Sequence, residues 1–300
     1  MRILNFGSLN IDYVYKVDHF VRGGETLSAD RMSIFCGGKG LNQSVAMGRA
    51  GLDVYHAGSI GKDGMFLLDM LRSAGVNTDN VRIRNDVMTG NAVIQNDNEG
   101  DNCIIINGGA NQAIDDEQVD RTMNCFTAGD YLVLQNEIND LPYIAEHAHT
   151  NGMKIVLNPS PMDKKVLELD LQQIDWFILN EIEACQLSGV ESDDEQVLLN
   201  ALLGKFPQAH IVITLGDRGS CYADRDKTCR QDIYKARVVD TTAAGDTFTG
   251  YLMAGIVNGY PIEKCLDMAS KAAAIAVTRS GAAPSIPTIQ EVTDWPTISP

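Results

Sequence analysis

Apolar runs and helical stretches alternate along most of this 300-residue chain. Apolar runs bounded by glycine, asparagine or aspartate predict buried strands at residues 2–6, 54–59, 131–135, 154–158, 176–179 and 211–215. Apolar residues at helical spacing predict helices at residues 63–74, 141–150, 181–187, 193–206, 248–258 and 261–278. Since helices that alternate with strands connect parallel neighbours, the pattern predicts a three-layer α/β fold with a mostly parallel central sheet flanked by helices.

Two segments interrupt this alternation with a strand-like period of two. The first spans residues 13–35, where short polar and apolar stretches alternate around a glycine pair at 23–24. The second comprises residues 89–95 and 103–106, which are separated by a turn-rich stretch at 96–101. Both patterns are typical of β-hairpins. We expect the two hairpins to pair into one small β-sheet.

The hairpins are interpreted as insertions, at about residues 12–36 and 88–107, into a single domain covering residues 1–300. A chain of this length exceeds a typical single core, but α/β folds often reach it as one unit. No internal repeat or low-complexity linker divides the sequence. Residues 219–224 and 228–234 predict an antiparallel pair at the edge of the main sheet.

The charge balance narrows the possible partners. The chain has 40 acidic and 24 basic residues, which give a formal net charge of −16. Nucleic-acid backbones and anionic membranes are bound through basic surfaces, so we expect neither as a partner. No apolar run in the sequence approaches membrane-spanning length.

The cysteines indicate a reducing compartment. Their number is seven, which is odd, and no C-x-x-C pair occurs. This usage fits reduced thiols in a cytosolic protein better than a disulfide framework or a zinc site, and we expect the thiols to be buried and inert. The chain begins with the strand-like residues 2–6 and no charged-then-apolar leader, which also favours a cytoplasmic protein.

A run of small residues between two aspartates carries the strongest candidate chemistry. It reads D-T-T-A-A-G-D-T-F over residues 240–248, after a strand-like stretch at 236–239 and before a predicted helix. The amides of Ala244, Gly245 and Asp246 would therefore lie at a helix N-terminus, where they favour an anion. A carboxylate in a first helical turn is also an ordinary helix-start residue. Here it would place a base beside an anion site, which is what phosphoryl transfer to a hydroxyl requires.

A second glycine-rich turn, G-G-K-G at residues 37–40, precedes apolar positions at helical spacing. Alone it is a weak signal, because it lacks the Ser or Thr that follows the lysine of a phosphate-binding Walker loop. Asn42 follows it, and Asn10 and Asp12 lie in the loop expected after the first strand. Converging amides and carboxylates can pair with the vicinal hydroxyls of a sugar, although an aspartate after a strand is also a common turn residue.

These motifs together resemble the ribokinase-like sugar kinases, also called the PfkB-type carbohydrate kinases. The resemblance covers residues 5–287 and several motifs in order. It implies an ATP-dependent phosphotransferase with an alcohol group as acceptor, in which Asp246 is the base. It implies an anion hole at Ala243, Ala244 and Gly245. It implies sugar contacts from Asn10, Asp12, Gly38, Lys39, Gly40, Asn42 and Glu137.

The resemblance also assigns a nucleotide site. Asn180 and Glu183 match the family's N-x-x-E motif, which lies near the phosphates and the magnesium water shell, although the same pattern is a simple helix cap. Residues 214–219 resemble the loop along the phosphates and ribose of ATP. The implied ATP contacts are Asn180, Thr214, Leu215, Gly216, Asp217, Arg218, Gly219, Gly245 and Ser270. Related kinases often have His or Asn where this chain has Ser270, which affects the contacts expected with the base.

The resemblance further implies Mg²⁺, with Glu183 in its region, and a potassium site. The implied potassium positions are Asp240, Thr242, Ala276, Arg279, Gly281 and Ser285. Most of them would offer carbonyl oxygens, which suit a large and weakly hydrated ion. The paired hairpins would form a lid over the sugar, and such lids often pair two subunits into a homodimer.

The leading interpretation is a kinase of a pentose, D-ribose phosphorylated on its 5-hydroxyl. A nucleoside or hexose kinase of the same family is the alternative, because lid residues such as Asn91 and Ile106 set the size of the substrate. A non-catalytic sugar-binding regulator is the third possibility. The presence of Asp246 together with the residues of the anion hole argues against it.

Overall fold

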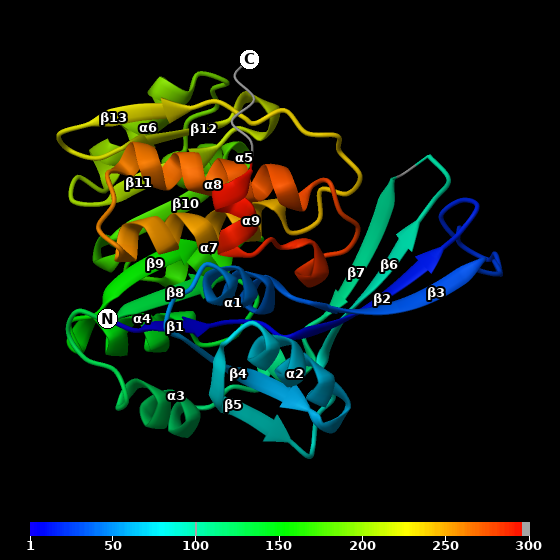
Figure 1. The fold of residues 1–300 in the computed structure, drawn as a ribbon. Helices are drawn as coiled ribbons and strands as arrows, with labels where there is room; N and C mark the ends of the chain where they lie inside the picture. The colour runs from blue at the N-terminus through cyan, green and yellow to red at the C-terminus, as the bar shows by residue number, and fades with distance from the viewer. Residues whose placement is uncertain (100, 296–300) are drawn as a thin grey trace.

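The computed structural model describes residues 1–99 and 101–295, so Gly100 in the turn of the second predicted hairpin and residues 296–300 of the predicted domain lie outside it. Its centre is a nine-stranded, mostly parallel sheet, which confirms the predicted fold class (Figure 1). In spatial order the strands are β13 (Thr228–Gln231), β12 (Ser220–Ala223), β11 (His210–Thr214), β10 (Trp176–Asn180), β9 (Lys154–Asn158), β8 (Tyr131–Gln135), β1 (Ile3–Phe6), β4 (Val54–Gly61) and β5 (Asn77–Arg84). As predicted, β12 and β13 form an antiparallel pair at one edge.

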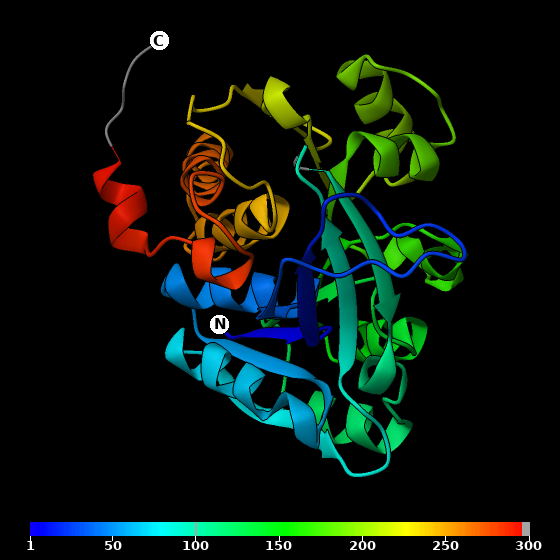
Figure 2. The ribbon, with the colours of Figure 1, turned by 90° about the vertical axis from the view of Figure 1, so that its right-hand side faces the viewer.

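Helices cover both faces of the sheet (Figure 2). One face packs against α1 (Lys39–Arg49), α2 (Met65–Ser73), α7 (Ala244–Val257), α8 (Ile262–Ala276) and α9 (Ile289–Asp294). The other face packs against α3 (Asp116–Met123), α4 (Leu141–Thr150), α5 (Glu181–Ser188) and α6 (Glu195–Lys205). Alternate strand residues enter the two cores, so Ile3 joins the first core and Leu4 the second. Within the described part of the chain, no helix combines the length and the apolar character needed to cross a bilayer.

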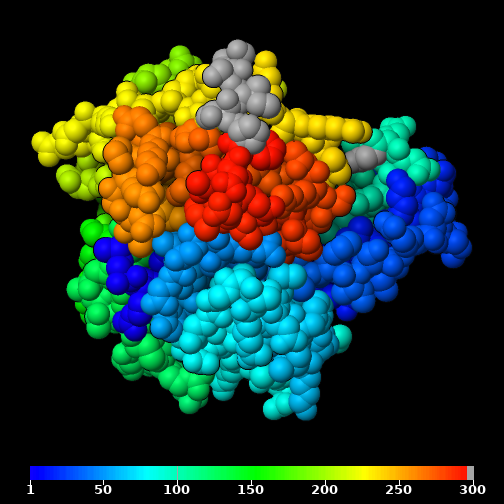
Figure 3. Space-filling view, in the orientation of Figure 1, coloured from blue at the N-terminus to red at the C-terminus, as the bar shows by residue number. Residues whose placement is uncertain are grey.

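The two hairpins form a separate small sheet, which we call the lid. It has the order β3 (Arg31–Gly37), β2 (Asn10–Lys16), β6 (Gly90–Asn96) and β7 (Asn102–Asn107). The hairpins join through parallel pairing of β2 with β6, which confirms the predicted small sheet. The lid projects from one side of the body (Figure 3).

The lid corrects two predictions about individual residues. Asn10 and Asp12 were expected in a loop, but both lie in strand β2, because the period-two pattern of the hairpin begins at Asn10. Asp12 pairs with Ala92, and Ala92 pairs with Ile106, so Ile106 shares the face of the lid that carries Asp12. Asn91 precedes Ala92 in β6 and lies on the opposite face of the lid, so the two residues predicted to set the size of the substrate do not share one face.

The structure differs from the predicted elements at four further places. Strand β5 and helix α3 were not predicted, because their sequences NTDNVRIR and DEQVDRTM are mostly polar. Helix α9 follows the helix expected to be the last, and it is a short helix begun by a Thr288–Glu291 capping box. Residues 236–239 form no strand, and their contact with the body includes a hydrogen bond from Val239 N to Val277 O.

The cysteines are less uniformly buried than expected. All seven are free thiols. Cys36, Cys221 and Cys265 are buried, but Cys103 and Cys125 are exposed, which contradicts the expectation that every thiol is buried. Cys103 lies in β7, whose residues are all exposed, and Cys125 follows the end of α3.

Candidate active site

A cavity of about 220 Å³ lies at the carboxyl ends of the central strands. Asn158 ends β9, Asn180 ends β10 and Thr214 ends β11, and all three side chains line the cavity. The first turn of α7 closes its other side. Open parallel sheets bind ligands at this edge, where the strand ends leave a crevice.

Asp246 lies in the first turn of α7 and is only 7% exposed. The turn before the helix is tight, because Ala243 at the N-cap has a left-handed φ of 60°. Asp246, Ala243, Ala244 and Gly245 all line the cavity, which places the predicted base and the predicted anion hole together. A Cβ on Gly245 would meet no atom within 4 Å, so the amides of this turn are approachable.

Helix α1 holds the Asp246 carboxylate by both oxygens. Asn42 Nδ2 donates to Oδ2 and Gln43 Nε2 donates to Oδ1, each at 3.0 Å. Both amides come from the helix that the G-G-K-G turn begins. The carboxylate is therefore fixed in orientation at the cavity wall.

Lys39 supplies a positive charge to the same cavity. Burial alone would lower the pKa of the Lys39 ammonium, but the nearby carboxylates of Asp246, Glu137 and Glu183 outweigh it and raise the pKa. Lys39 therefore stays protonated at neutral pH. A fixed cation at this position can stabilise negative charge on a transferring phosphoryl group.

Glu137 and Ser8 tie the start of α1 to the first strand. Glu137 accepts hydrogen bonds from Ser8 Oγ and, at 2.9 Å, from Lys39 N. Ser8 Oγ accepts in turn from Gly40 N at 3.1 Å. The close approach requires Gly40, since a Cβ there would lie 2.3 Å from Ser8 N. Gly38 adopts φ 92°, which favours glycine.

The lid carries two of the predicted sugar contacts, Asn10 and Asp12, and neither is among the described residues that line the first cavity. Asn10 Oδ1 accepts a hydrogen bond from Asn111 Nδ2 at 2.7 Å, which fixes the orientation of its amide. Asp12 lies two residues further along β2, and a Cβ on Gly37 would lie 2.0 Å from Asp12 Oδ2, so the carboxylate rests directly on Gly37. Burial, and then the charge of Glu137, raise the pKa of Asp12 to about 7. A buried carboxylate of this kind suits a ligand whose hydroxyl groups donate hydrogen bonds to it.

This raised pKa predicts a pH dependence. If ionised Asp12 accepts hydrogen bonds from the substrate, kcat/KM for the sugar should fall by about tenfold per pH unit as the pH drops below about 7, because kcat/KM reports the free enzyme. The kcat/KM for ATP should not show this fall at low pH. Steady-state kinetics from pH 5.5 to 8.5 checks the prediction. Asp12→Asn should remove the step near pH 7, and an unchanged step in that variant would assign it to another group.

A second cavity of about 410 Å³ continues from the first and shares Thr214, Thr241, Ala244 and Gly245 with it. Its far end is mostly apolar, with Phe248, Ala273 and Val277 in the wall. Ser270, Gly216, Asp217 and Gly219 also line it, so these predicted nucleotide residues come together. A flat aromatic base fits an apolar slot that opens onto a phosphate site.

Two predicted nucleotide residues fall outside the described linings of both cavities. Leu215 is 2% exposed and belongs to the core. The Arg218 guanidinium pairs with Glu181 at the start of α5. These two residues shape the loop at 214–219, and their side chains point elsewhere.

Asn180 and Glu183 support both interpretations of their motif. They form a complete capping box at the start of α5, in which Asn180 Oδ1 accepts from Glu183 N at 2.8 Å and Glu183 Oε2 accepts from Asn180 N at 3.0 Å. Both also line the first cavity. Among residues 1–99 and 101–295, no three His, Cys, Asp or Glu side chains gather as metal ligands. The carboxylates in the wall of the first cavity are those of Glu183 and Asp246.

Asp240 joins the turn before α7 to the segment after α8. Its Oδ1 accepts from Thr242 N at 2.9 Å and Thr242 Oγ at 2.6 Å, and its Oδ2 accepts from Gly281 N at 2.8 Å. Burial would raise the pKa of Asp240, but these hydrogen bonds outweigh it and lower the pKa, so the carboxylate is ionised. Ser285 is fully buried, and Ala276 and Arg279 lie at the end of α8 and just after it. The six predicted potassium positions thus come from two joined segments.

Several residues of the site were not predicted from the sequence. Gln43 contacts Asp246, Asn158 lines the first cavity, Ser8 holds Glu137, and Asn111 orients Asn10. Two of these residues could have been identified by their position in the sequence, since Gln43 follows Asn42 directly and Asn158 ends a predicted strand. Their partners lie far away in the sequence, so no local pattern identifies the contacts.

The comparisons with known proteins agree with this geometry. The chain matches the pfkB family of carbohydrate kinases over residues 2–289. The ribokinase of Haemophilus influenzae is 35% identical over 295 residues, covering 96% of each chain. The structure of Arabidopsis thaliana ribokinase complexed with ribose and ATP has a TM-score of 0.87 at 30% identity and covers 99% of both chains. That of Cryptococcus neoformans ribokinase in complex with ADP has a TM-score of 0.85 at 34% identity, covering 98% of this chain and 99% of the other.

Proposed function

This chain belongs to the pfkB family of carbohydrate kinases, and on that premise we propose that it is a ribokinase, which transfers the γ-phosphoryl group of ATP to the 5-hydroxyl of D-ribose. The observation that carries the proposal is the position of Asp246. It lies at the start of α7, beside the amides and Lys39, in a cavity that opens into the apolar slot. The names of the relatives, ribokinases from several organisms, support the choice of ribose.

The residues of the site divide the reaction between them. Asp246 accepts the proton of the 5-hydroxyl while the hydroxyl oxygen attacks the γ-phosphorus. The new P–O bond forms as the bond to the β-phosphate oxygen breaks, so the products are ribose 5-phosphate and ADP, with the proton on Asp246. The first-turn amides of α7 and the Lys39 ammonium stabilise the charge on the transferring group. Bound magnesium would neutralise phosphate charge, with Glu183 near its water shell.

The sugar is held from the lid and from α1. Asp12 and Asn10 present an acceptor and an oriented amide from β2. Asn42 Oδ1 is buried and has no hydrogen-bond partner among the described residues, which leaves it free for a sugar hydroxyl. Buried acceptors without a protein donor favour a ligand rich in hydroxyl groups, because each such acceptor is costly when left unpaired.

A nucleoside or hexose kinase remains the alternative within the family, and a non-catalytic sugar-binding regulator is the third. ADP release measured across pentoses, hexoses and nucleosides distinguishes them. The proposal predicts that D-ribose gives the highest kcat/KM. A higher value for a nucleoside or hexose would favour the second assignment, and no ADP release with any acceptor would favour the third.

We also propose activation by potassium at Asp240 and its partner segment. An ion bound there would order the turn that carries the amides of α7 without touching either substrate, and Asp240 supplies one negative charge for it. The rate in KCl should exceed the rate in tetramethylammonium chloride at equal ionic strength, with Mg²⁺ saturating in both. Equal rates in the two salts would contradict the cation site and leave the kinase assignment intact.

We propose that two subunits pair through the lid. Tyr13 is in register with Ile34 and with Val93, and Val93 is in register with Ile105, so these residues share the lid face opposite Asp12. Ile34 is 50% exposed and Ile105 is 63% exposed, which is unfavourable for a face that stays in water.

Sedimentation velocity should therefore show a dimer that Ile34→Glu/Ile105→Glu converts to a monomer. Leu167→Glu, at a residue outside the lid that is 61% exposed, is the control and should leave the dimer intact. A wild-type monomer at micromolar concentration would contradict the proposal.

The seven free thiols and the use of ATP favour the cytoplasm as the location of the protein.

A further inference from the structure

A row of buried polar side chains crosses the central sheet under helix α1. His56 in β4 is in register with Asn5 in β1, and Gln135 in β8 is in register with Asn158 in β9. Asn5, His56 and Gln135 have no exposed surface, and they share their face of the sheet with core residues such as Ile3, Val54 and Val133. Burying amides in a core is costly unless they are hydrogen-bonded, so this row calls for a physical reason.

Hydrogen bonds connect the row to Asp246 through Gln43, which is also fully buried. Gln43 Nε2 donates to Asp246 Oδ1 and to Asn158 Oδ1, both at 3.0 Å. Gln43 Oε1 accepts from Gln135 Nε2 at 2.7 Å, and the same nitrogen donates to Asn5 Oδ1 at 2.9 Å. Gln43 thus connects the amides of the sheet with the carboxylate of Asp246.

Elementary chemistry fixes which group donates and which accepts in this series of hydrogen bonds. An ionised carboxylate only accepts hydrogen bonds, so Gln43 must turn its NH₂ group toward Asp246. Its oxygen then faces Gln135, which must donate, and Gln135 in turn needs an acceptor, which Asn5 Oδ1 provides. Asn5 consequently directs its own NH₂ group to Gly40 O and Ser44 Oγ, each at 2.8 Å. Each amide is fixed by its neighbour.

We propose that Gln43 is a positioning residue for the catalytic base, and that Gln135 keeps the Gln43 amide in the orientation that presents a donor to Asp246. The proposal rests on the assignment of Asp246 as the base of the kinase reaction. Asn42 holds the second oxygen, but only Gln43 is itself held from the sheet. Without Gln43 the carboxylate can rotate away from the line between the sugar hydroxyl and the phosphate.

Gln43→Met tests this role, because methionine keeps the length and volume of the side chain and removes the amide. We expect kcat to fall by about 10²-fold, the typical cost of misplacing a reacting group by an ångström. The KM values for ribose and ATP should stay close to those of the wild type, because Gln43 is assigned no contact with either. This separation of kcat from KM distinguishes positioning from a general loss of structure.

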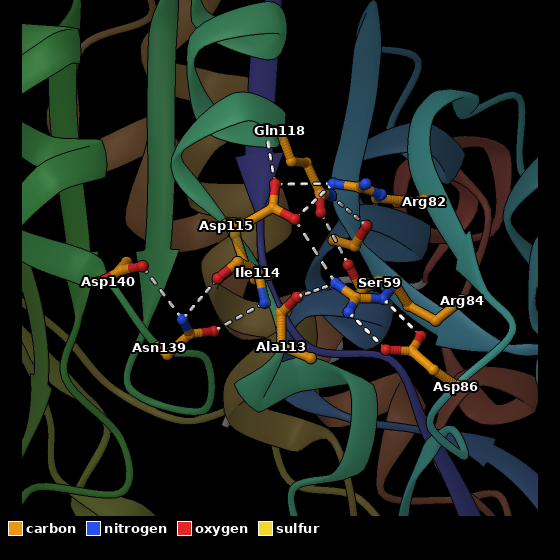
Figure 4. Close-up of polar contacts among 11 residues, drawn as sticks. Ser59, Arg82, Arg84, Asp86, Ala113, Ile114, Asp115, Gln118, Asn139 and Asp140 are labelled. Atoms are coloured by element: carbon orange, nitrogen blue, oxygen red, sulfur yellow. Dashed lines mark hydrogen bonds and ion pairs between the residues drawn. The ribbon is translucent and has the colours of Figure 1, made fainter.

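Gln118→Met is the matched control. Gln118 is a buried glutamine whose side chain bridges α3 and β4, with its Oε1 accepting from Ser59 Oγ at 2.9 Å and its Nε2 donating to Gly58 O at 2.7 Å (Figure 4). The substitution removes an amide of the same kind from another part of the core. It should lower the melting temperature by an amount similar to that of Gln43→Met and leave kcat unchanged.

Gln135→Met provides a second test of the proposal if Gln43→Met does not fold. Gln135 has no hydrogen bond to Asp246 and is not among the described residues that line either cavity, so we expect its effect on kcat to pass through its hydrogen bond with Gln43. We expect kcat to fall about tenfold, the value of one neutral hydrogen bond, with unchanged KM values. Wild-type kcat in a folded Gln43→Met enzyme, or in Gln135→Met where the former does not fold, would overturn the proposal. Absence of turnover in the wild type would instead refute the proposed function.

Discussion

Asp246→Asn is expected to lower kcat by about 10²–10⁴-fold, or somewhat more, while nucleotide binding stays close to that of the wild type. The substitution keeps the shape of the side chain and removes the proton acceptor. It also places an NH₂ group where Asn42 and Gln43 both present donors, so the new amide has one mismatched contact. Steady-state kinetics at saturating ribose and calorimetry with ADP measure the two effects separately.

Asp116→Asn is the matched control for this substitution. Asp116 also lies in the first turn of a helix, α3, and has no assigned role in the site. The control should keep wild-type kcat. Near-native turnover of Asp246→Asn at saturating ribose would show that another group is the base.

Asp12→Ala is expected to lower kcat/KM for ribose by about 10²–10⁴-fold, the value of two hydrogen bonds to a charged acceptor. Asp12 is largely buried near Glu137, and no described residue donates a hydrogen bond to its carboxylate. The bound sugar would supply those donors. The KM for ATP should barely change, because none of the predicted nucleotide contacts comes from the lid.

Asp18→Ala provides the comparison for the lid. Asp18 follows β2 in the same hairpin, and its side chain is exposed. That variant should have wild-type kinetics. If Asp12→Ala weakened ATP and ribose equally, Asp12 would have a role in folding and not in recognition of the sugar.

The sequence identified the elements with strong patterns and missed those without them. The small-residue run at 240–248 predicted the start of α7, because helix-start chemistry is local. Strand β5 was missed because an edge strand can be mostly polar when its neighbour supplies the register. The strand predicted at 236–239 is absent. These residues form an irregular segment, and two of them, Ala236 and Val238, line the second cavity. Apolar character alone does not distinguish a strand from such a segment.

The candidate site was predictable residue by residue only where a motif was local. Asp246, the G-G-K-G turn and Asn42 were recognised from short patterns. The contact of Asp246 with Gln43 joins residues 203 positions apart, and that of Gln135 with Asn5 joins residues 130 apart. Such pairs depend on the order of strands in the sheet, which the sequence pattern does not determine. The buried polar row under α1 therefore became visible only in three dimensions.

The central claim is that this chain transfers the γ-phosphoryl group of ATP to the 5-hydroxyl of ribose. Phosphorus NMR of the purified protein with Mg²⁺, ATP and either D-ribose or 5-deoxyribose tests it directly. The account predicts equal amounts of ADP and ribose 5-phosphate from ribose, and no phosphorylated sugar from 5-deoxyribose. A phosphorylated product from 5-deoxyribose, or a phosphate on any other hydroxyl of ribose, would contradict it.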